Sequence, residues 1–293
     1  KALYFEDQPF TYQEVNHRIN QLCHLLLESG VKKEDRVAVL LHNCHQYIEI
    51  FLGLSKIGAI LVPLNWRLAG PELEFILQDS GSRMLIFEAE FEEVVSSIRP
   101  RLNFSNGNYF TLGTPCADWA IEYEKAIKKK PTHEPPGNES FGDEDPHVIM
   151  YTSGTTGIPK GAVLSHRKTF FNVLNADIVY NLTSKDIMMV TRPMFHSGGL
   201  LVEAAPVLYK GGTLIIRKRF RPNEILETIQ KYKVTLLELA ATVYQFILQD
   251  CDLNQYDLSS VRCFFTGGER IPVAMLKEYQ KRGIIISQIF GQT

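Results

Sequence analysis

Tyr151-Thr-Ser-Gly-Thr-Thr-Gly-Ile-Pro-Lys-Gly161 is the most informative stretch of this chain. It joins four serine and threonine residues, three glycines and one lysine between an apolar run at 148–150 and a segment with helical spacing. Glycines let successive backbone amides turn toward an anion, and a lysine adds a mobile positive charge. The composition therefore indicates a loop that holds polyphosphate. A plain surface loop is the alternative that composition leaves open.

The spacing within this loop excludes a Walker A motif, in which lysine directly precedes serine or threonine, because Lys160 precedes Gly161. We expect its glycines to adopt positive φ angles and its hydroxyls to donate to phosphate. The candidate phosphate-binding residues are Thr152, Ser153, Gly154, Thr155, Thr156, Gly157 and Lys160.

Strand and helix patterns alternate along the rest of the chain. A capping box, Thr11-Tyr-Gln-Glu14, opens a helix that ends at Gly30. Because parallel neighbours need crossover connections, the alternation predicts a doubly wound α/β fold with mostly parallel sheets. Segment 105–145, with several prolines and glycines, is interpreted as a join between two subdomains at about 1–104 and 146–293. Strands are predicted at 36–41, 60–63, 83–87, 148–151, 187–190, 213–216, 234–239, 261–265 and 284–289.

Each notable motif directly follows a predicted strand. These motifs are 151–161, 192–199, 266–270 and 290–293. Ligands in doubly wound folds bind at the carboxyl ends of strands. We therefore expect the four loops to form one composite site on one edge of a sheet.

Composition limits the function classes. The 293 residues carry a net charge of −2 without a basic stripe, which argues against nucleic-acid binding. Five cysteines without a CxxC pair favour a reducing, cytoplasmic compartment. The apolar run 48–64 contains Glu49 and Lys56 and is too short for a transmembrane segment. Because the chain begins with Lys1 and stops just after a strand pattern, we expect a fragment of a longer protein.

The stretch 151–161 closely resembles the AMP-binding signature of the adenylate-forming superfamily. That superfamily includes acyl-CoA synthetases, adenylation domains of peptide synthetases and beetle luciferases. Further stretches resemble successive blocks of the same family along the whole chain: Thr11–Glu14, Asp35-Arg-Val-Ala-Val39, Gly58-Ala-Ile-Leu-Val-Pro-Leu-Asn65 and Arg192-Pro-Met-Phe-His196. The resemblance implies an AMP-binding N-terminal domain fragment of an acyl-CoA synthetase or fatty-acid–CoA ligase, without the C-terminal domain.

The reaction implied by this resemblance has two halves. A carboxylate attacks the α-phosphate of ATP to give an acyl-adenylate, and a thiol, usually that of coenzyme A, then displaces AMP. ATP, Mg²⁺ and coenzyme A are the implied cofactor and co-substrates. The resemblance assigns catalytic roles to Lys160, His196 and Thr293, and Thr156 is the candidate Mg²⁺ ligand.

Two further sets of residues are carried over from the family. The segments that match its adenine-binding and phosphate-binding blocks contribute Gly267, Gly268, Glu269, Phe290, Gly291, Gln292 and Thr293. The acyl-group candidates are His196, Gly198, Thr242, Val243 and Phe246, with Gly198 and Gly199 expected to leave space for the acyl group. From the residues alone, a packed histidine, a plain Gly-Gly turn and a core helix face remain alternatives.

The segments at 192–199 and 234–248 most resemble ligases of medium- or long-chain fatty acids. Aryl and succinylbenzoate CoA ligases, a luciferase-like oxygenase and a non-catalytic nucleotide-binding protein remain alternatives. No aspartate stands at Ala240 or Ala241, which disfavours an amino-acid substrate. We expect the fragment by itself to be inactive, and we leave a homodimer open.

Overall fold

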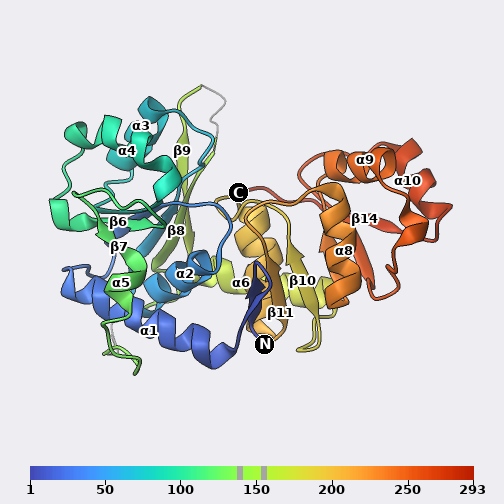
Figure 1. The fold of residues 1–293 in the computed structure, drawn as a ribbon, viewed down its shortest axis with the longest axis horizontal. Coiled ribbons are helices and arrows are strands. Elements are labelled where there is room, and N and C mark those ends of the chain that lie inside the picture. The colour runs from blue at the N-terminus through green and yellow to red at the C-terminus, as the bar shows by residue number, and fades with distance from the viewer. Residues whose placement is uncertain (137–140, 153–156) are drawn as a thin grey trace. The chain divides into compact units, whose positions relative to one another are not determined.

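The computed structural model describes residues 1–136, 141–152 and 157–293. The chain forms two compact units, and each contains one seven-stranded sheet. Unit 1 comprises Lys1–Phe10, Asn172–Pro193 and Ser197–Thr293, and unit 2 comprises Thr11–Phe171 and Met194–His196. The doubly wound, mostly parallel α/β architecture is confirmed (Figure 1). The chain divides at other positions than the expected 1–104 and 146–293.

The sheet of unit 2 is parallel except at one edge. Among its described strands only β8 and β9 pair antiparallel, and this pairing places Thr152 opposite Lys160. In spatial order the strands are β7 (Ile121–Glu122), β6 (Tyr109–Leu112), β5 (Met84–Glu88), β3 (Arg36–Leu40), β4 (Ile60–Pro63), β8 (Pro146–Thr152) and β9 (Lys160–Ser165).

Helices cover both faces of this sheet. The capping box is confirmed: Thr11 Oγ1 accepts from Glu14 N at 3.1 Å, and Glu14 Oε2 accepts from Thr11 N at 2.7 Å. The helices are α1 (Tyr12–Glu28), α2 (His45–Ile57), α3 (Gly70–Asp79), α4 (Glu92–Ile98) and α5 (Tyr123–Ile127), with short 3₁₀ turns η1 (Ala89–Phe91), η2 (Arg99–Arg101) and η3 (Asn106–Asn108). Helices α3 and α4 pack on the side chains of Ala38 and Leu40. Because side chains alternate across a strand, the other face of β3 is left for α1 and α2, which Figure 1 shows on the opposite side of this sheet.

The segment 105–145 is more than a join. It contributes β6, β7 and α5, which extend the sheet of unit 2 beyond β5. All four residues of β6 are buried. The expectation of a surface join was wrong here, because these short apolar strands lie among prolines and glycines that hide their pattern.

The sheet of unit 1 is completed by the beginning of the chain. Strand β1 pairs in parallel with β11, with Leu3 opposite Leu214, and β2 folds back on β1. In spatial order the strands are β14 (Ile286–Gln288), β13 (Cys263–Thr266), β12 (Leu236–Glu238), β10 (Ile187–Val190), β11 (Thr213–Ile216), β1 (Leu3–Phe5) and β2 (Gln8–Phe10).

The two faces of this sheet bear different helices. Its helical segments are α6 (His166–Tyr180), which begins in unit 2, the π-helical segment η4 (Gly198–Ala204), α7 (Ala205–Tyr209), α8 (Pro222–Tyr232), α9 (Ala241–Asp250), the 3₁₀ turn η5 (Leu253–Gln255) and α10 (Val273–Gln280). Helices α8, α9 and α10, orange to red in Figure 1, pack over Met189, Ile215 and Leu237. Tyr180 of α6 stacks on Phe265 at a centroid distance of 4.6 Å.

None of the helices in the described ranges is long and apolar enough to cross a membrane.

Candidate functional site

The four motif loops do follow strands, but the strands belong to two sheets. The loop 151–161 follows β8 in unit 2, whereas the loops after β10, β13 and β14 belong to the sheet of unit 1. The expectation of four loops on one sheet edge was therefore wrong. The alternation of strands and helices does not show where one sheet ends and the next begins.

The two ends of the glycine- and hydroxyl-rich stretch lie in the antiparallel pair β8 and β9. Thr152 ends β8 and Lys160 opens β9 directly opposite, and both are exposed. Gly157 has a φ of +83°, and no atom lies within 4 Å of the position that a Cβ would take, so backbone conformation rather than space favours glycine here. The candidates Ser153, Gly154, Thr155 and Thr156 lie outside the described residues. The pairing places Lys160 next to Thr152, at the ends of the two strands where the connection begins.

The loop after β10 contributes residues to each unit. In unit 2 the Met194 N–H donates to Asn43 Oδ1 at 2.8 Å, and the exposed His196 follows two residues later. In unit 1 a Cβ on the buried Gly199 would lie 2.5 Å from Pro193 O. The chain's own backbone fills the position that a Cβ would take, and the expectation that Gly199 leaves space for an acyl group stays a prediction. Gly198 is buried as well.

The loops after β13 and β14 lie side by side in unit 1. The Ile289 N–H donates to Thr266 O at 2.8 Å, and Gln288 Nε2 donates to Glu269 O at 3.3 Å. A Cβ on Gly267 would lie 2.8 Å from Ile289 Cγ1, so a larger residue here would displace the Ile289 side chain. Gly268 has a φ of +82°, which also favours glycine.

The last residues of the described chain meet the loop after β10. Ser197 Oγ and Thr293 Oγ1 are 2.9 Å apart and share a hydrogen bond. The structure thus brings two of the predicted loops together through Ser197, which was not a candidate. Phe290 is 89% exposed, so its ring is available for stacking, and Gly291 and Gln292 are exposed beside it.

The acyl-pocket candidates on α9 do not share one environment. Thr242 and Phe246, four residues apart, are exposed on one face of the helix. Val243 is half-buried and packs against the core under α8, α9 and α10. Val243 therefore serves the core, whereas Thr242 and Phe246 remain candidates.

Sequence reasoning missed a cluster of charged residues beside these loops. Arg192 Nε lies 2.8 Å from Glu238 Oε1, and the buried Glu203 accepts from the backbone N–H groups of Thr191 and Arg192 at 2.9 and 3.1 Å. Burial raises the pKa of the Glu203 carboxyl well above its ordinary value, and burial raises the pKa of Glu238 to about 7. The sequence does contain a signal for this cluster. Each glutamate interrupts an apolar run, and a charge buried in such a run needs a partner.

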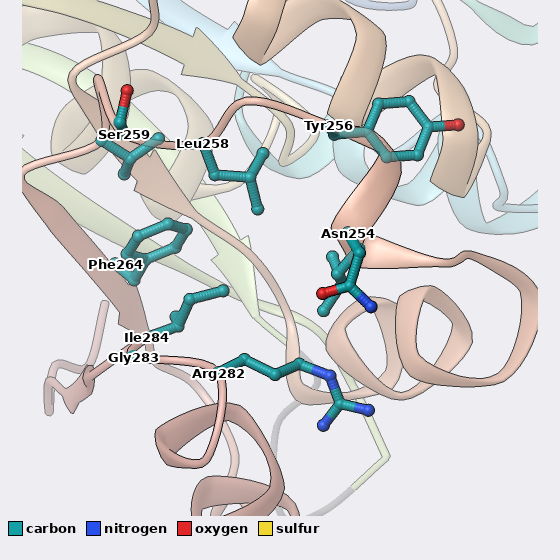
Figure 2. Close-up of a pocket in the computed structure, with 10 residues that line it drawn as sticks. Asn254, Tyr256, Leu258, Ser259, Phe264, Arg282, Gly283 and Ile284 are labelled. Carbon is teal, nitrogen blue, oxygen red and sulfur yellow. The ribbon is translucent and has the colours of Figure 1, made fainter.

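An open pocket of about 380 Å³ lies elsewhere in unit 1. Apart from Phe264 of β13, its lining residues precede β13 and β14, so it lies at the amino ends of these strands and away from the loops that follow them. Figure 2 shows Leu258, Phe264 and Ile284 around its apolar part, with the polar ends of Asn254 and Arg282 at one side. It is not the predicted site.

One group of metal-ligand residues occurs in the described part of unit 2. His42, Glu88 and Glu90 have potential ligand atoms within 4.8 Å of one another. His42 Nδ1 already lies 2.7 Å from Glu88 Oε2, and its ring stacks on Phe91 at 5.1 Å. This ion pair accounts for the approach of His42 and Glu88, and the group does not include the Mg²⁺ candidate Thr156.

Known proteins resemble this chain along its whole length. A family model described as "AMP-binding enzyme" matches residues 1–293. Feruloyl-CoA synthase of Amycolatopsis sp is 34% identical over 283 residues, which cover 97% of this chain and 54% of the relative. The long-chain-fatty-acid–CoA ligase FadD13 of Mycobacterium tuberculosis is 31% identical, over 98% of this chain and 55% of the relative.

A solved structure gives the same result. The anthranilate CoA ligase AuaEII in complex with anthranoyl-AMP superposes with a TM-score of 0.92 and 28% sequence identity, over 99% of this chain and 56% of that chain. The chain thus spans about half the length of the relatives that it matches.

Proposed function

Because this chain belongs to the AMP-binding enzyme family, we propose that the protein activates a carboxylic acid with ATP and transfers the acyl group to coenzyme A. The observation that carries the proposal is the antiparallel pairing of β8 and β9, which holds Lys160 opposite Thr152. The contact between Ser197 and Thr293 in unit 1 supports it, because it joins the loops proposed for the acid and for the α-phosphate.

The proposed chemistry proceeds in two displacements. A carboxylate oxygen attacks the α-phosphorus of ATP, and the bond from that phosphorus to the bridging oxygen breaks to release pyrophosphate. The thiolate of coenzyme A then attacks the acyl carbon, and AMP leaves with the electron pair of the acyl–oxygen bond. Such transfers depend on positioning and charge stabilisation more than on proton transfer.

The residues of this chain divide the work. Lys160 would balance the charge of the departing pyrophosphate, and Thr152 and the amide of Gly157 would donate to it. His196 and Thr293 would orient the carboxylate and the α-phosphate. When bound, Mg²⁺ would supply further charge neutralisation, with Thr156 as its proposed ligand.

We propose a medium- or long-chain fatty acid as the substrate. A fatty-acid–CoA ligase among the relatives and the apolar Phe246 side chain, exposed on α9, support this class. An aromatic acid is the second candidate, because the feruloyl-CoA synthase shares a higher identity with this chain. The five free cysteines support a reducing, cytoplasmic location, and a homodimer stays a prediction.

ATP–pyrophosphate exchange by the intact protein tests the reaction and its substrate. A panel of octanoate, palmitate, ferulate and anthranilate separates the two acid classes. Lys160→Met should lower exchange by about a hundredfold, as removal of a charge-stabilising group does. Lys168→Met, an exposed lysine on α6, is the matched control and should exchange at the wild-type rate.

Exchange that no acid stimulates would overturn the proposed function, and stimulation by aromatic acids alone would replace the fatty-acid proposal. The 293-residue chain alone should not complete the reaction, since it spans about half of its relatives. Turnover equal to that of the intact protein would contradict this last point.

A further inference from the structure

Three charged side chains meet where β10 and β12 end in unit 1. Arg192 follows β10, Glu238 is the last residue of β12, and Glu203 lies in η4. Glu203 is 0% exposed and Glu238 is 2% exposed. Charges buried this deeply are tolerated only with partners, so the arrangement of the three groups is specific.

The guanidinium of Arg192 bridges two segments of unit 1. Its Nε lies 2.8 Å from Glu238 Oε1, and its Nη2 donates to the carbonyl oxygen of Gly267 at 2.6 Å. Its backbone N–H donates to Glu203 Oε2 at 3.1 Å, so both the backbone and the side chain of Arg192 are held. The planar guanidinium presents Nε to the carboxylate and Nη2 to the carbonyl in a fixed geometry, whereas a lysine would have to reach both groups with one nitrogen on a flexible stem.

The charge balance of the cluster leaves Arg192 little freedom to bind an anion. Burial and repulsion from Glu238 raise the pKa of Glu203 well above its ordinary value, and burial raises the pKa of Glu238 to about 7. Glu238 Oε2 accepts no hydrogen bond from any residue in the described ranges. Both shifts favour the uncharged carboxyl, and Glu238 is the group paired with the Arg192 guanidinium.

The remaining titratable groups near the pair do not alter this balance. They are Tyr180 of α6, Tyr244 of α9 and Cys263 of β13. Burial raises the pKa of each of these groups, so all three are uncharged near neutral pH. Arg192 can therefore act on the site mainly through its bond to Gly267.

The loop that Arg192 holds is tightly packed. Gly267 lies against Ile289, as described above, and a Cβ on Gly268 would lie 3.3 Å from Arg192 Nη1. The loop is thus enclosed between the guanidinium on one side and the segment after β14 on the other. Movement of the guanidinium would release the Gly267 carbonyl and loosen residues 266–269.

We propose that Arg192 is a positioning residue for nucleotide binding, with a guanidinium that Glu238 orients and that fixes the carbonyl of Gly267. The inference rests on the proposed function, in which residues 267–269 lie along the adenine. Arg192 sets the affinity for the nucleotide through this loop without contacting phosphate.

Two substitutions in the intact protein separate this role from charge compensation. Arg192→Lys keeps a cation beside Glu238, so its melting temperature should stay close to that of the wild type, but it lacks the second nitrogen that reaches the Gly267 carbonyl. Its affinity for ATP and AMP, measured by calorimetry, should fall roughly tenfold or more, as loss of a charged hydrogen bond predicts. Arg192→Met should bind as weakly or more weakly and should also melt earlier. Measurement at pH 6 keeps the carboxyls protonated and this variant folded.

An ion pair at the amino ends of strands in the same sheet, opposite to the ends that bear Arg192 and Glu238, provides the control. Arg262 Nε lies 2.8 Å from Asp186 Oδ1, and the two residues directly precede β13 and β10. Arg262→Met should lower the melting temperature and leave nucleotide affinity unchanged.

The outcomes distinguish the inference from the function on which it rests. Wild-type affinity in Arg192→Lys would overturn the positioning role alone. Equal weakening in Arg262→Met and Arg192→Lys would also overturn it, because any loss of sheet stability would then suffice. A wild-type protein that binds neither ATP nor AMP would overturn the proposed function and this inference together.

Discussion

Replacement of Gly199 by alanine tests the backbone packing at the start of η4. A Cβ at this buried position would lie 2.5 Å from Pro193 O, 2.6 Å from Arg192 O and 2.7 Å from Pro193 C. Ordinary contacts between such atoms are about 3.5–4.0 Å, so each is short by roughly 1 Å. All three atoms belong to the backbone, so no change of side-chain rotamer relieves the overlap.

The cost follows from the shift that the backbone must make. An added methyl group in a well-packed interior destabilises a protein by about 1–3 kcal/mol. We expect about 3 kcal/mol here, since three backbone atoms must move together. At roughly 2–4 °C per kcal/mol, the melting temperature should fall by about 6–12 °C.

The assay is urea and thermal unfolding of the wild type, Gly199→Ala and a control. Gly107→Ala is the control, because a Cβ there meets no atom within 4 Å. The control should unfold with the wild-type free energy, within about 0.5 kcal/mol. A Gly199→Ala variant that also stays within this range would refute the reasoning, because the backbone of residues 192–193 would then yield at no cost.

Three further predictions concern buried titratable side chains. Burial raises the pKa of Glu238 from 4.5 to about 7, so the wild type should lose stability as the pH rises from about 4.5 through 7. In Glu238→Gln the urea midpoint should depend less steeply on pH over this range. A dependence as steep as that of the wild type would contradict the assignment. Burial lowers the pKa of His147 from 6.5 to about 3, so stability should be lost as the pH falls from about 6.5 toward 3. The His147 ring stacks on Phe51 at 4.8 Å, and His147→Phe can keep this contact. This variant should lose the acid sensitivity of the melting temperature. Arg18 Nε lies 2.6 Å from Oε1 of the fully buried Glu49. Arg18→Met should lower the free energy of unfolding in urea by about 3–5 kcal/mol, because it leaves a buried carboxylate without this cation. A loss under about 1 kcal/mol would show that the Glu49 carboxyl is held without Arg18.

The sequence pattern predicts the parallel core of each sheet better than its edges. Strands β4, β10 and β11 span the residues expected from their apolar runs. Strands β1, β2 and β7 have only two or three residues, which is too short for a periodic signal. Their places depend on partners elsewhere in the chain, and a local pattern does not contain that information.

The candidate site was predictable as a set of loops but not as a geometry. Lys160 was expected in a loop, yet it begins β9 opposite Thr152, because antiparallel pairing with β8 extends across Tyr151 and Gly161. The register of such a pair is set by both strands and their connection together. The composition of the stretch alone could not place the lysine.

The charged cluster shows a second limit of sequence reasoning. Glu203 and Glu238 stand far apart in the chain, and each resembles a single solvated charge in an apolar segment. Glu238 meets Arg192 because parallel strands β10 and β12 are neighbours in the sheet, whereas Glu203 reaches the backbone of Arg192 from η4. The role of Gly199 is hidden in the same way, since the backbone that surrounds it is arranged by the turn after β10.

The pairing of β1 with β11 has a consequence for synthesis of the protein. Leu3 cannot pair with Leu214 until the whole intervening chain has left the ribosome. At about 5–20 residues per second, residues 1–10 wait roughly 10–40 s for their partner strand. Unit 2, whose main segment is Thr11–Phe171, can fold during that interval. Strand β1 is therefore synthesised before unit 2 but joins its sheet after unit 2 can have folded. Until then it is an unpaired apolar segment that chaperones can bind.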